Sequence, residues 1–186
     1  MIEIPIKQEH TSFIEEFAEK QTIGGFSNLA SDDLKKATRL DFQMTGVAAE
    51  LGWYLYRYNN FDKLKNLLEH KFQTLRPAKK GDGGFDDSIT HNNKTRFVDV
   101  KSSHVESEDR IKYLNLVIPP REFHQNMIYV CAFCVGKTRQ KVDKVILAGW
   151  EINECITKKW KYDPNKYCVP VNELRPMKDL EKYLIV

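Results

Sequence analysis

Residues that could act on a phosphate gather in two runs joined by a short polar turn. The first run is 81–90 (GDGGFDDSIT) and the second is 95–103 (TRFVDVKSS). Both contain the β-branched and aromatic residues that favour strands, and the Asn92-Asn93 pair suits a two-residue hairpin loop. That loop would place Asp86 opposite Asp99. Strand side chains alternate between faces, so Asp99 and Lys101 share one face.

Two carboxylates that face each other across a hairpin repel, so their placement needs a chemical explanation. Their Cβ atoms would lie ~4.5–5.5 Å apart, so they must share a proton, bind a cation or be neutralised by a neighbour. Magnesium takes oxygen ligands and often uses one or two carboxylates together with a substrate phosphate. Lys101 would then place a positive charge beside a metal-bound water. Val98 and Val100 point the other way, into the predicted core. The alternative is a solvated hairpin with scattered charges.

Asp86 together with Asp99-Val100-Lys101 resembles the signature of the PD-(D/E)xK nuclease superfamily, whose members have the restriction-endonuclease-like fold. The glycine-rich run 81–86 is most similar to the version in methyl-directed restriction endonucleases and Holliday-junction resolvases. Phe85 stands where the family usually has proline, and Asp99 where glutamate is commoner. The resemblance implies an α/β three-layer sandwich, with a mixed central sheet flanked by helices, that hydrolyses DNA phosphodiester bonds with Mg²⁺ or Mn²⁺.

A long helix is predicted from residue 31 to residue 58, with an apolar stripe at helical spacing. Glu50 lies at the edge of that stripe, and Gly46, on the same flank, would let a neighbouring backbone approach. The superfamily commonly supplies a third acid from the helix before the hairpin, and Glu50 matches that role. The resemblance therefore implies Asp86, Asp99 and Glu50 as metal ligands, with Lys101 orienting or deprotonating the water. A surface glutamate on a solvated flank is the alternative.

Arg76, Lys79 and Lys80 lie between a predicted helix (61–75) and the hairpin. Basic residues leading into an acidic metal site would suit a DNA phosphate backbone. A basic linker without a partner explains them equally well.

The composition is that of a globular protein, and the length favours one domain. The chain has 186 residues and a formal net charge of +3, which permits an anionic partner. It contains no apolar run of the ~18 residues typical of a membrane span and no signal-peptide pattern, so we expect a cytoplasmic protein. The four cysteines would then be reduced. Cys131 and Cys134 fall on opposite faces of a predicted strand (127–135), although a zinc or iron–sulfur set with Cys155 and Cys168 is an alternative.

We expect one nuclease domain over 1–186. It would comprise a helical part (9–76), the motif hairpin and sheet (81–150), and C-terminal helices (151–186). Further strands are predicted at 112–118, 142–150 and 167–171, and helices at 151–159 and 174–184. The expected function is that of an endonuclease. A homodimer is a further hypothesis, because a single site cuts only one DNA strand. The alternative is a catalytically inactive nucleic-acid-binding or protein-interaction module on the same fold.

Overall fold

A curved five-stranded mixed sheet forms the centre of the protein in the computed structural model, which describes residues 1–23, 33–67, 85–91 and 93–184. Strand order is β1-β6-β5-β3-β2. β3 and β5 pair in parallel, and the other neighbours pair antiparallel. The strands are β1 (Ile2–Pro5), β2 (Asp87–His91), β3 (Lys94–Val105), β5 (Met127–Val135) and β6 (Lys144–Ile152). The strand expected at 127–135 is confirmed, and β1 is an addition to the sequence prediction.

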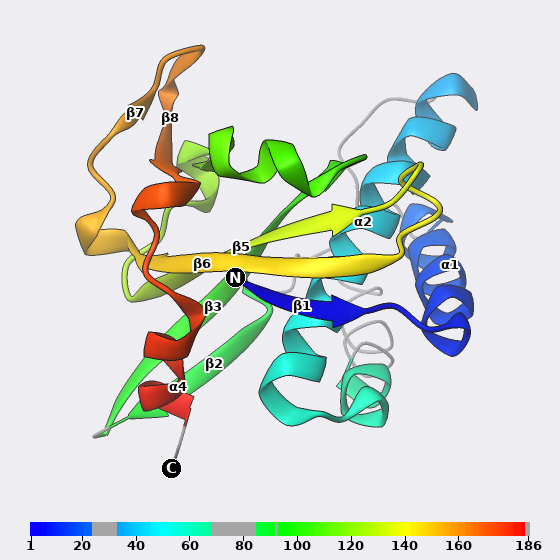
Figure 1. The fold of residues 1–186 in the computed structure, drawn as a ribbon, viewed down its shortest axis with the longest axis horizontal. Coiled ribbons are helices and arrows are strands. Elements are labelled where there is room, and N and C mark those ends of the chain that lie inside the picture. Colours follow the sequence, from blue (N-terminus) through cyan, green and yellow to red (C-terminus); the bar gives the residue numbers. More distant parts are fainter. Residues whose placement is uncertain (24–32, 68–84, 92, 185–186) are drawn as a thin grey trace.

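Helices cover one face of this sheet (Figure 1). They are α1 (Gln8–Ile23), α2 (Asp33–Tyr58), helical turns over 61–67, and α4 (Met177–Leu184). The apolar stripe predicted on the long helix is confirmed. Val47 and Leu51 of α2 are buried in one core with Val98 and Val100 of β3. Burial of this stripe holds α2 against the sheet.

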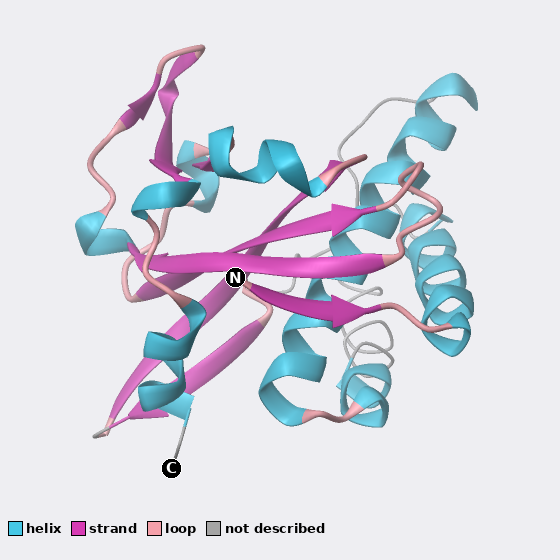
Figure 2. Cartoon of the chain, viewed as in Figure 1, coloured by secondary structure: helices cyan, strands magenta, loops and turns pink. Residues whose placement is uncertain are grey.

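A second, smaller sheet with 3-10 turns covers the opposite face. Its strands lie in the order β4-β8-β7 and comprise β4 (Asn115–Ile118), β7 (Lys159–Trp160) and β8 (Asp163–Pro170). The turns are η2 (Glu108–Tyr113), η3 (Pro120–Glu122), η4 (Asn153–Cys155) and η5 (Val171–Glu173). β7 and β8 form a hairpin that projects beyond the central sheet (Figure 1). The α/β class is confirmed, but within the described residues the second face carries strands and short turns instead of the expected helical layer (Figure 2).

The helix predicted at 151–159 is wrong, and with it most of the expected C-terminal helical part. β6 continues to Ile152, and Lys159 instead pairs with Tyr167 of β8. Sheet pairing is a tertiary contact, and here it overrides a weak local helical preference. The closing helix does form, as α4, but it begins at Met177.

The hairpin register predicted from the sequence is confirmed. Asp87 pairs with Val98, and His91 pairs with Lys94 across the turn. Asn93 has a φ of 59°, the left-handed conformation that tight hairpin loops require. Asn92 lies outside the described residues. No helix in the described part of the chain is long and apolar enough to cross a membrane.

Candidate active site

Asp99 and Lys101 lie on the face of β3 turned away from the helices, as the alternation predicts. Asp99 is 6% exposed, and Lys101 Nζ lies 2.7 Å from Asp99 Oδ2. Val98 and Val100, which point to the helical layer, are buried in the core. The charge of Asp99 is therefore neutralised by a neighbour, Lys101, which is one of the three explanations that the sequence left open.

Asp86 lies one residue beyond the last ladder pair, where β2 begins to leave β3. Its main-chain N–H donates to the Val98 carbonyl oxygen (2.7 Å). Its carboxylate Oδ2 accepts the Val100 N–H at 2.7 Å. The Asp86 carboxylate is therefore fixed against the backbone between Asp99 and Lys101. The two acids are neighbours at the end of the hairpin, but the ladder does not extend to a directly opposed Asp86–Asp99 pair.

Glu122 joins this group from the 3-10 turn η3. Glu122 Oε2 lies 2.7 Å from Lys101 Nζ, so the lysine is held between two carboxylates. The buried Tyr129 of β5 fixes the turn, since its hydroxyl donates to the Glu122 carbonyl (2.8 Å) and accepts the His124 N–H (2.9 Å). The sequence prediction missed Glu122, which follows Lys101 by 21 positions in a turn without a recognisable spacing.

The two carboxylates determine the charge of Lys101. Burial alone would lower the pKa of Lys101, but Asp99 and Glu122 outweigh it and raise the pKa above its ordinary value. Burial would likewise raise the pKa of Glu122, but its hydrogen bond to Lys101 brings that pKa below the usual value. Lys101 is therefore an ammonium ion at neutral pH. This favours a role in orienting water and offsetting charge over a role in removing a proton.

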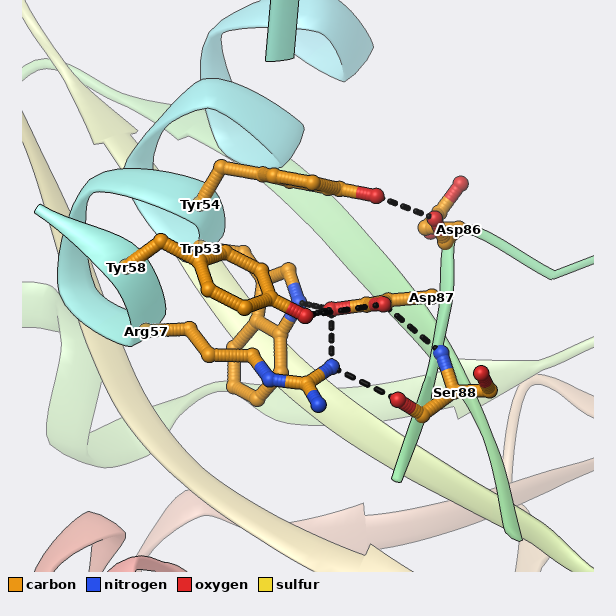
Figure 3. Close-up of polar contacts among 7 residues, drawn as sticks. All are labelled: Trp53, Tyr54, Arg57, Tyr58, Asp86, Asp87 and Ser88. Atoms are coloured by element: carbon orange, nitrogen blue, oxygen red, sulfur yellow. Dashed lines mark hydrogen bonds and ion pairs between the residues drawn. The ribbon is translucent and has the colours of Figure 1, made fainter. Parts of the chain in front are cut away.

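Helix α2 brings Glu50 to the same end of the hairpin. Tyr54, one turn after Glu50, donates its hydroxyl to the Asp86 carbonyl at 3.0 Å (Figure 3). Burial is the main cause that raises the pKa of Tyr54, and the charges of Asp87, Glu50 and Asp86 add to it. Glu50 therefore acts electrostatically on the same hydroxyl group as Asp86. Its role as a metal ligand stays a prediction.

Asp87 points toward α2 and fastens the hairpin to that helix (Figure 3). Its Oδ2 accepts from Trp53 Nε1 (2.9 Å), from Arg57 Nη1 and from the Tyr58 hydroxyl (3.3 Å). The side chains of Asp87 and Arg57 are 11% and 14% exposed. The sequence assigned Asp87 no catalysis, and these contacts fasten the start of β2, next to Asp86, to α2.

The oxygen donors at this end of the hairpin fit a hard divalent cation. Asp86 and Asp99 supply two carboxylates, and a magnesium site is commonly completed by water and substrate phosphate. Among the described residues, no group of three or more His, Cys, Asp or Glu side chains is arranged to hold a metal ion. A complete protein cage is not required for Mg²⁺, because the substrate supplies ligands.

Two further sequence predictions concern the basic residues before the hairpin and the glycine on the flank of α2. Arg76, Lys79 and Lys80 lie outside the described residues. The close backbone approach expected at Gly46 is wrong, because apart from α2 itself no described residue has an atom within 4 Å of where its Cβ would be.

The cysteines are separated as predicted. Cys131 and Cys134 are buried on opposite faces of β5, in two different cores. Burial raises the pKa of each thiol to about 12. Cys155 is exposed and accepts a hydrogen bond from Arg175. Because they lie on opposite faces of β5, Cys131 and Cys134 cannot bind the same metal ion.

Comparisons of the chain with family models, with curated proteins and with solved structures found no match. The functional argument must therefore come from the residues and their geometry.

Proposed function

We propose that this protein is a Mg²⁺- or Mn²⁺-dependent endonuclease that hydrolyses DNA phosphodiester bonds. The observation that carries the proposal is the arrangement at the end of the hairpin. The Asp86 carboxylate is bonded to the Val100 N–H, and the ion-paired Asp99 and Lys101 lie on either side of that residue. Two carboxylates and an ammonium group gathered at the open end of the β2–β3 hairpin suit a metal ion and a phosphate.

Each residue has a distinct part in the proposed reaction. Asp86 and Asp99 would hold the metal, supported by Glu50. A bound divalent ion would lower the pKa of a water and neutralise charge on the phosphate. Lys101 would orient the attacking water and offset the negative charge that develops on the phosphoryl oxygens.

Glu122 supports Lys101 in this scheme. Lys101 has a second carboxylate partner in Glu122, 2.7 Å away. Asp99 can therefore bind a metal without leaving the lysine unpaired. We propose that Glu122 is a positioning residue and that Arg76, Lys79 and Lys80 contact the DNA backbone.

Incubation of the purified protein with supercoiled, linear and four-way-junction DNA tests this function. We expect cleavage with Mg²⁺ or Mn²⁺ and none with EDTA. Asp86→Asn and Asp99→Asn should each abolish it. Cleavage that persists in EDTA, or in both variants, would show that these acids do not act through a metal.

A binding-only role is the second candidate, and one observation favours it. Lys101 is already paired with both Asp99 and Glu122, as in an ion-pair network whose role is structural. DNA binding without cleavage in either metal would support this alternative. A homodimer is part of the endonuclease proposal, because cutting both strands requires two sites. Light scattering that shows a monomer with and without DNA would exclude it.

A further inference from the structure

A groove of about 1080 Å³ runs along β3 directly after Lys101. Residues 102–105 of β3 line it, together with parts of α2, η2 and the β7–β8 hairpin. Its volume exceeds the roughly 300–1,000 Å³ of typical small-molecule sites. The groove is therefore large enough for a segment of a polymer.

Exposed aromatic rings gather in this groove. Phe42, Tyr113 and Tyr162 are 54%, 74% and 72% exposed, and all three line it. Trp160 also lines it and packs edge-on against Tyr162, with ring centroids 5.4 Å apart. Large apolar side chains clustered on a surface indicate a binding site.

A cation lies over each of these rings. Arg139 lies over Phe42 at 4.6 Å from its centroid, Lys112 over Tyr113 at 4.9 Å, Lys161 over Tyr162 at 4.7 Å, and Lys166 over Trp160 at 5.5 Å. Among the described lining residues, Arg110, Arg139 and Lys166 are basic and Glu106 is acidic. The groove therefore combines flat rings with an excess of positive charge.

We propose that this groove binds a single-stranded segment of nucleic acid. Unpaired bases would stack on the rings, and the cations beside them would contact the phosphates. A duplex keeps its bases stacked inside the helix, so it cannot use the rings. An acidic peptide would use the cations but would leave the aromatic surface without a complementary group.

The position of the groove connects it with the proposed active site. Ser103 lies two residues after Lys101 on the same face of β3, a distance of ~6–7 Å along a strand. The sugar-phosphate backbone of a nucleic acid bound in the groove would therefore run toward Lys101. The preferred substrate would then be DNA with an unpaired arm. This role rests on the proposed nuclease function, although binding itself can be measured without cleavage.

Fluorescence anisotropy with the full chain in EDTA tests the inference. The probe is a fluorescein-labelled oligo(dT) of roughly 16 nucleotides, the upper range for one single-strand binding fold. A Tyr113→Ala/Tyr162→Ala variant should bind the oligonucleotide at least about tenfold more weakly, given the stacking contribution of each ring. Tyr113→Phe/Tyr162→Phe is the matched control, because it keeps the rings and should keep the affinity.

Three further results decide the outcome. A blunt duplex of the same length should bind more weakly than oligo(dT), and a polyglutamate competitor should not displace the oligonucleotide. Wild-type affinity in the alanine variant, equal affinity for duplex, or no binding by the native protein would overturn the inference. Displacement by polyglutamate would indicate an acidic-peptide site.

The two proposals can fail separately. Oligo(dT) binding is measured in EDTA, where no metal and no cleavage are needed, so it does not depend on the nuclease function. Loss of binding in the tyrosine-to-alanine variant alone therefore supports the groove. Absence of metal-dependent cleavage in the native protein counts against the nuclease function alone.

Discussion

Lys101 lies between two carboxylates, and this arrangement changes the chemistry expected from the sequence. The resemblance allowed Lys101 to orient water or to deprotonate it. The raised pKa of Lys101 leaves it charged at neutral pH, so it is a poor base there. The repulsion between acids that the sequence suggested is offset at Asp99 by the same ammonium group.

The pairing of Glu122 predicts a pH-dependent stability. The pKa of Glu122 is lowered from its ordinary value of 4.5 in the folded protein. Its contribution is thus present above that value and lost as the pH falls through the lowered folded-state pKa. Urea unfolding should show that Glu122→Gln is less stable than the native protein at neutral pH. The difference in unfolding free energy should shrink in acid, and a constant or growing difference would contradict the pairing.

Asp87 should be important for stability although it is not catalytic. Asp87→Ala would leave the nearly buried Arg57 without its carboxylate, and breaking a buried ion pair costs about 3–5 kcal/mol. Glu154→Ala is the matched control, because it breaks the exposed Arg96–Glu154 pair and should cost about 0–1 kcal/mol. Chemical denaturation measures both. Equal effects would show that Asp87 does not anchor the hairpin.

At the level of elements, two glycines of α2 provide a matched test of helix packing. A Cβ on Gly52 would meet the Val145 side chain of β6 at 2.7 Å, whereas a Cβ on Gly46 would meet no described atom outside α2 within 4 Å. Gly52→Ala should destabilise the protein by about 1–3 kcal/mol through overpacking. Gly46→Ala should stabilise it by about 0.5–1 kcal/mol, because alanine favours a helix. Thermal or urea unfolding that showed the same sign for both would contradict the packing of α2 on β6.

Local signals explain which elements the sequence could predict. The β2–β3 register follows from alternation and from one asparagine turn, and the structure confirms both. The apolar run of β5 identified that strand to the residue. The β7–β8 hairpin depends on pairing between segments of mixed polarity, and the sequence predicted only a short strand at 167–171 in this region. Glu122 reaches Lys101 through a turn fixed by Tyr129, a tertiary contact that no spacing in the sequence reveals.

For the whole molecule, the central sheet separates two cores that serve different parts of the proposed function. The core on the helical side holds α2, which carries Glu50 and contacts Asp86 through Tyr54. The core on the other side supports η3 and the small sheet, which contribute Glu122 and one wall of the groove. β3 contributes side chains to both cores, and it carries Asp99, Lys101 and the groove residues 102–105 along one strand.

The most direct test of the central claim is the single-turnover cleavage rate of Lys101→Met in Mg²⁺. Lys94→Met is the control, because Lys94 is an exposed lysine at the start of the same strand. Thermal melts establish that both variants are folded. We predict that Lys101→Met slows cleavage by about 10²–10³-fold, the cost of removing one group that stabilises developing charge. Lys94→Met should cleave at the native rate. A folded Lys101→Met protein that cleaves DNA as fast as the native protein would contradict the assignment of this hairpin as an active site.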